Sequence, residues 1–236
     1  MSTAPVRHKA TLIAKTQLAG KFILGRFRLG ESETMNFTAG QHIMWYIAPG
    51  INRSMSLASP QAWLPEFEIC HDVSPMGPGS RWMVALTVGD EVEFMGPLGV
   101  FTLDKESSRP KFFIATGSGI APFRAMILDY LEGLPARQSP ITLYWGLRSP
   151  QDVFWQQEFS ELSSKYPNFR FILTLSQPDG SWQGKSGRVT AHLEEIANPP
   201  GNDYYLCGNK NMVEEVSQWL LGQNVPKPQI KTELFY

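Results

Sequence analysis

Two short segments bring groups that suit phosphate binding into otherwise apolar surroundings. Residues 116–122 read Thr-Gly-Ser-Gly-Ile-Ala-Pro after an apolar run, and their glycines would let the backbone approach a pyrophosphate at the start of a helix. Residues 53–56 read Arg-Ser-Met-Ser inside another apolar run. An ordinary strand-to-helix turn would also explain the first segment, and a solvated strand edge would also explain the second. The elements predicted around the two segments are needed to choose between these interpretations.

Up to about Lys105 the chain alternates short apolar runs with Gly, Pro and Asn, which is typical of antiparallel strands. The apolar runs cover residues 22–29, 41–48, 53–59, 67–73 and 90–95. One helix is predicted between the last two runs, with Ser80 as its N-cap and its end at Gly89, because the apolar residues there follow helical spacing. The pattern predicts an antiparallel barrel or sandwich with one helix.

From Arg109 the rhythm changes to a strand followed by a helix, repeated to the C-terminus. Strands are predicted at residues 111–116, 141–147, 169–175 and 203–207, helices at 121–133, 151–166, 189–197 and 210–222, and a last strand within 229–236. This alternation indicates a parallel sheet covered by helices. The polar stretch 103–110 separates the two patterns, so we expect a β-barrel domain at 1–106 and an α/β domain at 107–236.

Composition excludes several classes of function. The 21 basic and 22 acidic side chains give no overall field that would gather nucleic acid or an anionic membrane. No apolar run reaches the roughly 18 residues of a membrane span, and the first residues lack the apolar core of a secretory signal, so we expect a cytoplasmic protein. Two cysteines, Cys70 and Cys207, are too few for an iron–sulfur cluster, and we expect no metal site.

Four ordered motifs carry a resemblance to a known family. They read RSMS at 53–56, GPLGVF at 96–101, TGSGIAP at 116–122 and CGNKNM at 207–212. In this order they resemble the ferredoxin–NADP reductase superfamily, over most of the chain from residue 37 to the C-terminus. The resemblance implies a β-barrel flavin domain followed by an α/β parallel-sheet domain that binds NAD(P).

The resemblance implies that the barrel domain binds FAD. Arg53 would contact the phosphate-bearing chain of the flavin, because a guanidinium fork pairs well with phosphate, and Ser56 would lie at N5 of the ring, the atom that accepts hydride. Met55 replaces the family's usual aromatic residue against one flavin face. Ser80 and the backbone at the start of the following helix would cradle the flavin pyrophosphate. The full implied set is Arg53, Ser54, Met55, Ser56, His71, Val73, Gly79 and Ser80.

The same resemblance assigns the pyrophosphate of the nicotinamide nucleotide to the turn at 116–122. Arg148 and Arg188, with Lys185 nearby, match the cations that hold a 2′-phosphate in NADPH-selective members, whereas Gln177 stands where those members often have arginine. The resemblance therefore favours NADPH over NADH only slightly. The implied nucleotide set is Thr116, Gly117, Gly119, Ile120, Pro122, Arg148, Ser176, Lys185, Arg188, Cys207 and Gly208.

Three residues take catalytic positions by the resemblance: Ser56, Cys207 and Glu233. Cys207 would line the nicotinamide site and orient the ring, although a cysteine at the end of an apolar strand also fits a small buried hydrophobe. Glu233 could position the nicotinamide or relay a proton. The terminal aromatics, Phe235 and Tyr236, could cover the flavin face that the nicotinamide must reach.

We therefore expect a flavoenzyme that moves hydride between NAD(P)H and FAD and exchanges single electrons with a small carrier protein such as ferredoxin or flavodoxin. A free-flavin reductase, the reductase component of an oxygenase and a non-catalytic flavin-binding subunit are the alternatives. Six basic residues could form a docking rim for an acidic carrier, or could simply be solvated strand faces. They are Arg7, Lys9, Lys15, Lys21, Arg26 and Arg28.

Overall fold

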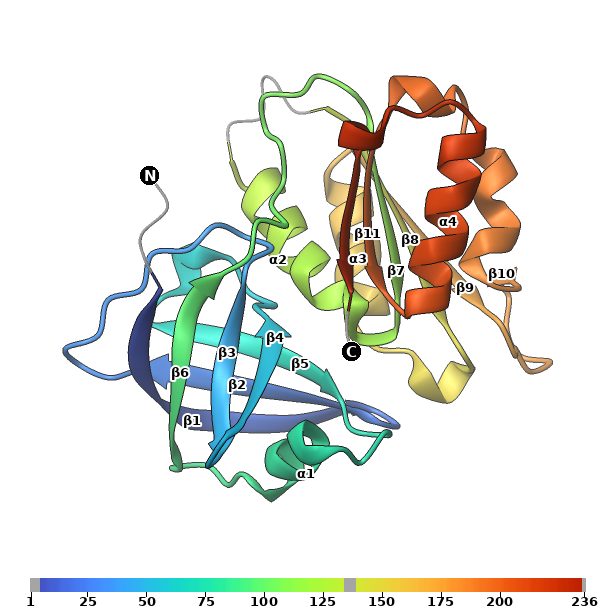
Figure 1. Ribbon diagram of the computed structural model, residues 1–236. Coiled ribbons are helices and arrows are strands. Elements are labelled where there is room, and N and C mark those ends of the chain that lie inside the picture. The colour runs from blue at the N-terminus through green and yellow to red at the C-terminus, as the bar shows by residue number, and fades with distance from the viewer. Residues whose placement is uncertain (1–4, 134–138, 235–236) are drawn as a thin grey trace. The chain divides into compact units, whose positions relative to one another are not determined.

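A computed structural model describes residues 5–133 and 139–234 of the chain (Figure 1). The chain divides into two compact units. The barrel unit contains the described residues up to Leu103 together with Ala121–Asp129, and the parallel-sheet unit contains Asp104–Ile120 and the described residues from Tyr130 onward.

The barrel unit is built on a six-stranded antiparallel sheet with strand order β4-β3-β6-β1-β2-β5. A bridge between Leu57 and Ile69 joins the chain just after β4 to β5, so the two edge strands of the sheet meet. The barrel expected from the sequence is confirmed. The bounds are β1 Val6–Ala19, β2 Phe22–Leu29, β3 His42–Ala48, β4 Ile51–Ser56, β5 Glu66–Asp72, β6 Glu91–Leu98 and helix α1 Pro78–Ala85; a 3₁₀ turn covers Gln61–Trp63.

Alternating side chains of these strands fill the barrel with an aromatic core. Trp45 lies 4.8 Å from Phe27 and 5.1 Å from Phe94, measured between ring centroids, and Phe67 lies 5.5 Å from Phe94. All four side chains are fully buried. Ring pairs at these distances stabilise a core beyond their buried area alone, and these rings join β2, β3, β5 and β6.

The structure corrects two expectations for the barrel unit. Strand β1 was not predicted, because its inward residues His8, Ala10 and Leu12 alternate with charged and polar ones in a stretch that contains no uniform apolar run. The predicted start and end of α1 are wrong. The helix begins at Pro78, whose fixed φ suits the first helical position, has Gly77 as its N-cap and ends at Ala85. Ser80 therefore lies inside the first turn.

The parallel-sheet unit contains a six-stranded sheet with strand order β10-β9-β8-β7-β11-β12, and all of its pairings are parallel. Each predicted strand of this half is present. The bounds are β7 Lys111–Thr116, β8 Ile141–Leu147, β9 Phe169–Leu175, β10 Lys185–Ser186, β11 Asp203–Gly208 and β12 Ile230–Leu234, with helices α2 Ile120–Leu131, α3 Gln156–Lys165 and α4 Lys210–Gly222. Parallel pairing directs the carboxyl ends of all six strands to the same edge.

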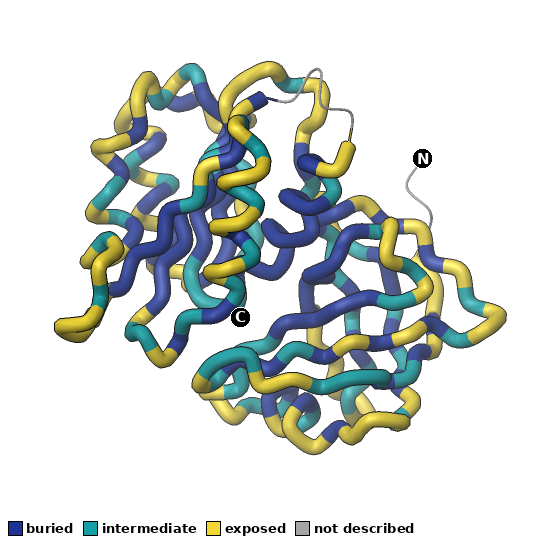
Figure 2. Tube along the Cα trace, turned by 180° about the vertical axis from the view of Figure 1, so that it is seen from behind, coloured by how far each residue is buried: buried dark blue, intermediate teal, exposed yellow. Residues whose placement is uncertain are grey.

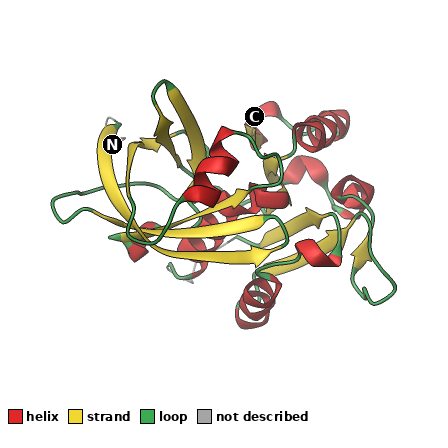
Figure 3. Cartoon of the chain, turned by 90° about the horizontal axis from the view of Figure 1, so that it is seen from below, coloured by secondary structure: helices red, strands yellow, loops and turns green. Residues whose placement is uncertain are grey.

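Helices cover both faces of this sheet (Figure 3). On one face, α4 packs its Val213 and Val216 with Ile114 of β7 and Leu206 of β11. On the other face, Phe159 of α3 contacts aromatic rings of β8 and β9. Residues predicted as a helix at 189–197 form a 3₁₀ helix, Val189–Glu195, with i to i+3 bonds such as Ala191 N–H to the Arg188 carbonyl.

Two further details differ from the prediction in this unit. A 3₁₀ turn at Pro150–Asp152 precedes α3, and α3 begins only after Trp155, whose φ of 51° interrupts a continuous helix from residue 151. Helix α2 is buried along nearly its whole length (Figure 2). Its residues Ala121–Asp129 belong to the barrel unit, while its first residue, Ile120, belongs to the parallel-sheet unit.

Candidate functional site

The end of β4 and the start of α1 form the candidate phosphate site of the barrel unit. A Cβ placed on Gly79 would lie 3.3 Å from Cγ of Arg53 and 3.5 Å from Cε of Met55. Gly79 therefore lets β4 approach the first turn of α1 closely. Arg53 is exposed and donates from Nη1 to the carbonyl of Asn52 at 2.7 Å.

The N-terminus of α1 fits an anionic group. Its N-cap is Gly77, which has no side chain to make a capping hydrogen bond. The first N–H groups of a helix carry a partial positive charge, and Arg53 lies beside this turn. The residues present therefore fit the flavin phosphates that the sequence motifs imply.

Ser80 and His71 lie together beside that turn. Oγ of Ser80 is 3.3 Å from Nε2 of His71 and 3.4 Å from the carbonyl oxygen of Asp72. Burial lowers the pKa of His71, although the nearby Asp72 carboxylate acts in the opposite direction. The structure thus brings His71 of β5 within hydrogen-bonding distance of Ser80 of α1, and their contact with a flavin stays a prediction.

The remaining residues assigned to the flavin differ in exposure. Ser56 is buried, Ser54 is exposed, and Met55 is buried within the barrel core cluster. Val73 is half-buried, packs against the same cluster and donates its N–H to the carbonyl of Lys21 at 2.8 Å. The side chain of Met55 therefore serves the barrel interior as well as the approach to Gly79.

The candidate nucleotide site of the parallel-sheet unit is the turn Gly117–Gly119 between β7 and α2. A Cβ on Gly119 would collide with the carbonyl oxygen of Cys207, and a Cβ on Gly208 would overlap the hydroxyl of Thr116. Asn209 donates its N–H to Oγ1 of Thr116 at 2.9 Å. Glycine at 119 and 208 is required by this close approach.

A side chain of the neighbouring strand β8 also holds this turn. Trp145 of β8 donates from Nε1 to the carbonyl of Gly117 at 3.0 Å. Ile120 and Pro122 lie in the first turn of α2, where proline needs no backbone partner, and both are buried. The turn therefore presents N–H groups at the carboxyl end of the sheet, the edge at which parallel sheets bind nucleotides.

Cys207 is fully buried at the end of β11 and pairs in register with Glu233 of β12. Burial raises the pKa of its thiol well above the usual value, and the Glu233 carboxylate adds to this effect. The thiol is therefore neutral near neutral pH and unsuited to act as a nucleophile. Phe235 and Tyr236 lie outside the described residues.

The predicted 2′-phosphate cations have different partners. Arg148 donates from Nε to Oε1 of Gln177 at 3.0 Å and remains exposed, next to Ser176, whose N–H bonds the Leu147 carbonyl. Lys185 lies 2.6 Å from Glu195. The bond from Lys185, with a further one from His192, lowers the pKa of Glu195.

Arg188 is exposed at the start of the 3₁₀ helix Val189–Glu195. Because Lys185 is matched by a carboxylate, it adds less positive charge than Arg148 and Arg188 do.

The six basic residues expected to form a docking rim do not gather into a row of unpaired charges. Lys15 donates to the carbonyls of Val84 and Leu86, at the end of α1. The others face carboxylates on neighbouring elements: Arg7 and Lys9 face Glu93, Lys21 faces Asp72, Arg26 faces Glu68 and Arg28 faces Glu66. Pairing with carboxylates on neighbouring elements accounts for the five residues other than Lys15, and a docking role for the six stays a prediction.

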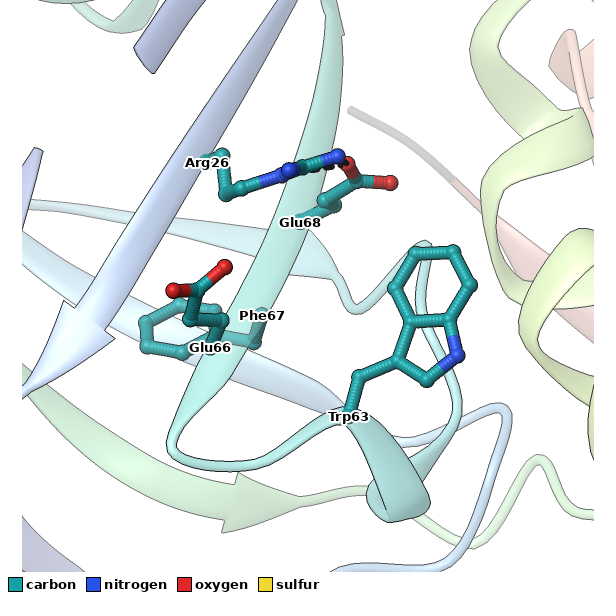
Figure 4. Close-up of a pocket in the computed structure, with 5 residues that line it drawn as sticks. All are labelled: Arg26, Trp63, Glu66, Phe67 and Glu68. Atoms are coloured by element: carbon teal, nitrogen blue, oxygen red, sulfur yellow. Dashed lines mark hydrogen bonds and ion pairs between the residues drawn. The ribbon is translucent and has the colours of Figure 1, made fainter. Parts of the chain in front are cut away.

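One cluster of charged side chains beside β5 was not predicted from the sequence. Glu68 is buried between Arg26 and Arg124, and the pocket next to it holds about 320 Å³. Figure 4 shows Arg26 reaching Glu68, with Trp63 nearby. The signal in the sequence was a single arginine, Arg124, in the otherwise apolar stretch 120–128.

Two negative findings concern the described part of the chain. Within residues 5–133 and 139–234 there is no group of three or more His, Cys, Asp or Glu side chains that could hold a metal ion. In the same ranges, no helix is both long and apolar enough to span a bilayer.

Comparison with known proteins identifies both halves of the chain. Residues 9–103 match the oxidoreductase FAD-binding domain, and residues 113–218 match the oxidoreductase NAD-binding domain. Ferredoxin–NADP reductase B of Sorangium cellulosum is 29% identical over 220 residues, which cover 89% of each chain. The phenol 2-monooxygenase reductase component DmpP of a Pseudomonas strain is 34% identical over 211 residues, 86% of this chain. This chain spans only 58% of the length of DmpP.

Solved structures share the fold of this chain. The Amycolatopsis reductase GcoB superposes with a TM-score of 0.89 at 27% identity, covering 99% of this chain and 71% of that one. The ferredoxin NADP⁺ reductase of Neisseria gonorrhoeae, determined with bound FAD and NADP, gives a TM-score of 0.82 at 22% identity with full coverage of both chains. This chain belongs to the ferredoxin–NADP reductase superfamily and is a FAD-dependent NAD(P)H oxidoreductase.

Proposed function

We propose that this oxidoreductase takes reducing equivalents from NADPH and delivers single electrons to a ferredoxin or a flavodoxin. When bound, FAD supplies the conversion between two-electron and one-electron chemistry. The observation that supports the proposal is that motif residues pack together within each unit: Arg53 lies against Gly79, and the turn before α2 lies against the end of β11.

In the barrel unit, Arg53 and the backbone of the first turn of α1 bind the flavin phosphates. Ser80 adds a hydroxyl whose direction is set by His71 and the Asp72 carbonyl. Ser56, at the buried end of β4, supplies a hydroxyl at N5 of the flavin. These residues bind and orient the flavin, and none of them has to form a covalent bond to it.

In the parallel-sheet unit, the N–H groups after Thr116 bind the pyrophosphate of the nucleotide. The neutral thiol of Cys207 packs against the nicotinamide and fixes its orientation. Glu233, paired with Cys207 across β11 and β12, places a carboxylate beside the same position. The role of this pair is to limit the ways in which the nicotinamide ring can lie.

NADPH is the favoured nucleotide because Arg148 has a neutral partner. Its hydrogen bond to Gln177 holds the guanidinium without neutralising it, so the charge is available for a 2′-phosphate. Arg188 is the second cation of this pocket. Lys185 contributes little, since Glu195 already compensates its charge.

A second candidate function is the reductase component of an oxygenase. It is favoured by the 34% identity to DmpP, which exceeds the 29% identity to the Sorangium reductase. Both candidates pass electrons from the flavin to another protein and differ in that protein.

The carrier assay separates electron transfer to a carrier protein from reduction of free flavin. Reduction of a purified two-iron ferredoxin and of a flavodoxin is followed spectrophotometrically with NADPH and catalytic amounts of the protein. Saturable, carrier-dependent turnover supports the proposal. Turnover that requires only added free flavin and is indifferent to both carriers would show a free-flavin reductase instead.

A further inference from the structure

The carboxylate of Glu68 binds two arginines at once. Arg26 donates to Oε1 from Nη2 at 2.8 Å and from Nε at 3.0 Å, while Nη1 of Arg124 lies 2.7 Å from Oε2. The side chains of Glu68 and Arg124 are 2% and 7% exposed, and that of Arg26 is 46% exposed. Arg124 is therefore the buried member of the cluster, and Arg26, which Figure 4 draws beside Glu68, is its exposed member.

Arg124 has a second acceptor that Arg26 lacks. Its Nη1 also donates to the carbonyl oxygen of Ala58 at 2.9 Å. Glu68 holds the same segment through its backbone, because Ala58 donates to the Glu68 carbonyl at 2.8 Å and the Glu68 N–H donates to Oγ of Ser59 at 2.9 Å. Glu68 and Arg124 thus both hold the chain immediately after β4 by hydrogen bonds.

This segment continues directly from Ser56. Only Leu57 separates Ser56 from Ala58, and Leu57 is itself bridged to Ile69 of β5. A shift of the Ala58 carbonyl would therefore move the end of β4 that carries the Ser56 hydroxyl. Arg124 lies on α2, one turn after the residue at which that helix begins.

Stability alone does not account for a buried ion pair at this place. Well-packed apolar residues of similar volume often replace such pairs without loss, because desolvation of the charges offsets their attraction. The ring of Trp63 lies 5.2 Å from the Arg124 guanidinium and helps to exclude water from it. A directional contact that sets the position of the Ala58 carbonyl is a role that an apolar pair cannot fill.

We propose that Arg124, held by Glu68, is a positioning residue. It sets the position of the end of β4, and with it the position of the Ser56 hydroxyl, for hydride transfer to the flavin. The inference rests on the proposed role of Ser56 in FAD binding. Arg124 acts through the Ala58 carbonyl and touches neither cofactor in this account. Arg26 shares the carboxylate but not the carbonyl, so it is the matched control.

The test compares Arg124→Gln, Arg124→Lys and Glu68→Gln with Arg26→Gln. Three quantities are measured: the Kd of FAD from quenching of flavin fluorescence, the visible circular dichroism of the bound flavin, and the limiting rate of its anaerobic reduction by NADPH. We expect Arg124→Gln to retain FAD but to change the dichroism and to lower the limiting rate by roughly 10- to 100-fold. Arg124→Lys should recover part of the loss.

Glu68→Gln should change the limiting rate in the same direction as Arg124→Gln, and the double variant should add little, because the two residues act as a unit. Arg26→Gln should match the wild-type protein in all three measurements. If Arg124→Gln does not fold, Arg124→Lys and Glu68→Gln carry the test.

Two results would overturn the inference: wild-type dichroism and limiting rate in the Arg124 and Glu68 variants, or an equal loss in Arg26→Gln, which would show a general effect of the cluster. Failure of the wild-type protein to bind FAD at all would instead remove the proposed function. The two failures are therefore distinguishable in one experiment.

Discussion

The carbonyl oxygen of Cys207 occupies the space that a Cβ on Gly119 would need. The backbone carbon of Cys207 lies 2.6 Å and the Cα of Gly208 lies 2.7 Å from the same point, so the obstacle is backbone that cannot rotate away. This contact joins the turn before α2 to the end of β11. It brings two motifs that lie far apart in the sequence into contact.

Substitution Gly119→Ala should separate the turn from β11. We expect a loss of about 1–3 kcal/mol in the free energy of unfolding, typical of overpacking against a rigid neighbour, together with weaker NADP⁺ binding. Thermal unfolding and isothermal titration with NADP⁺ measure the two effects. Gly180→Ala is the control, since no described atom lies within 4 Å of a Cβ there. Equal behaviour of the two variants would contradict the close contact.

Arg53→Gln should weaken FAD binding. A charge-assisted hydrogen bond contributes about 1.5–3 kcal/mol, so the Kd of FAD for the apoprotein should rise roughly 10- to 100-fold. Fluorescence titration gives this value directly. Arg28→Gln removes an exposed arginine that is paired with Glu66 and should leave the Kd unchanged. An unchanged Kd in Arg53→Gln would exclude the phosphate contact.

Arg148→Gln and Arg188→Gln should each raise the Kd of NADPH, by about tenfold, while leaving the Kd of NADH nearly unchanged, because only NADPH carries the 2′-phosphate. Lys185→Gln should have a smaller effect, since Glu195 already pairs with Lys185. Stopped-flow reduction over a range of nucleotide concentrations yields these constants. A parallel loss for NADPH and NADH would argue against a 2′-phosphate pocket at these arginines.

The buried thiols predict a loss of stability at high pH. Burial raises the pKa of Cys207 and of Cys70 above the ordinary value of 9.0, so the unfolded chain loses these protons first. The contribution of the buried thiols to the free energy of unfolding is complete below about pH 9. It declines as pH rises further, by at most about 1.4 kcal/mol per pH unit for each thiol. Urea unfolding between pH 7 and roughly pH 10 measures the trend.

Cys207→Ala and Cys70→Ala should each flatten this decline. In the wild-type protein both thiols should also resist alkylation by iodoacetamide under native conditions, because the reactive thiolate is disfavoured. Rapid native alkylation of Cys207 would contradict its burial.

The sequence was most informative where a local pattern has a single structural outcome. Strand–helix alternation after residue 109 predicted the parallel sheet, because apolar strands joined by helices have few other arrangements. The approach of Gly119 to Cys207 follows from that topology, since β7 and β11 are neighbours in the sheet. Prediction from the sequence failed for residues whose hydrogen bonds or ion pairs are made with partners distant in the sequence.

Ser80 shows the limit at the level of one residue. Its type suits an N-cap, yet Pro78 starts the helix two residues earlier and the Ser80 hydroxyl faces His71. Arg26 shows the same limit for charge, because its carboxylate partner on β5 is 42 residues away in the chain. Pairing across strands depends on register, and register is set by the whole sheet.

The most direct test of the account is anaerobic titration of the purified protein, reconstituted with FAD, with NADPH and with NADH while the flavin absorbance is recorded. We expect stoichiometric bleaching of bound flavin by NADPH, with NADH requiring higher concentrations, and a large loss of the rate of flavin reduction in Ser56→Ala. Tightly bound flavin that neither nucleotide bleaches would contradict it.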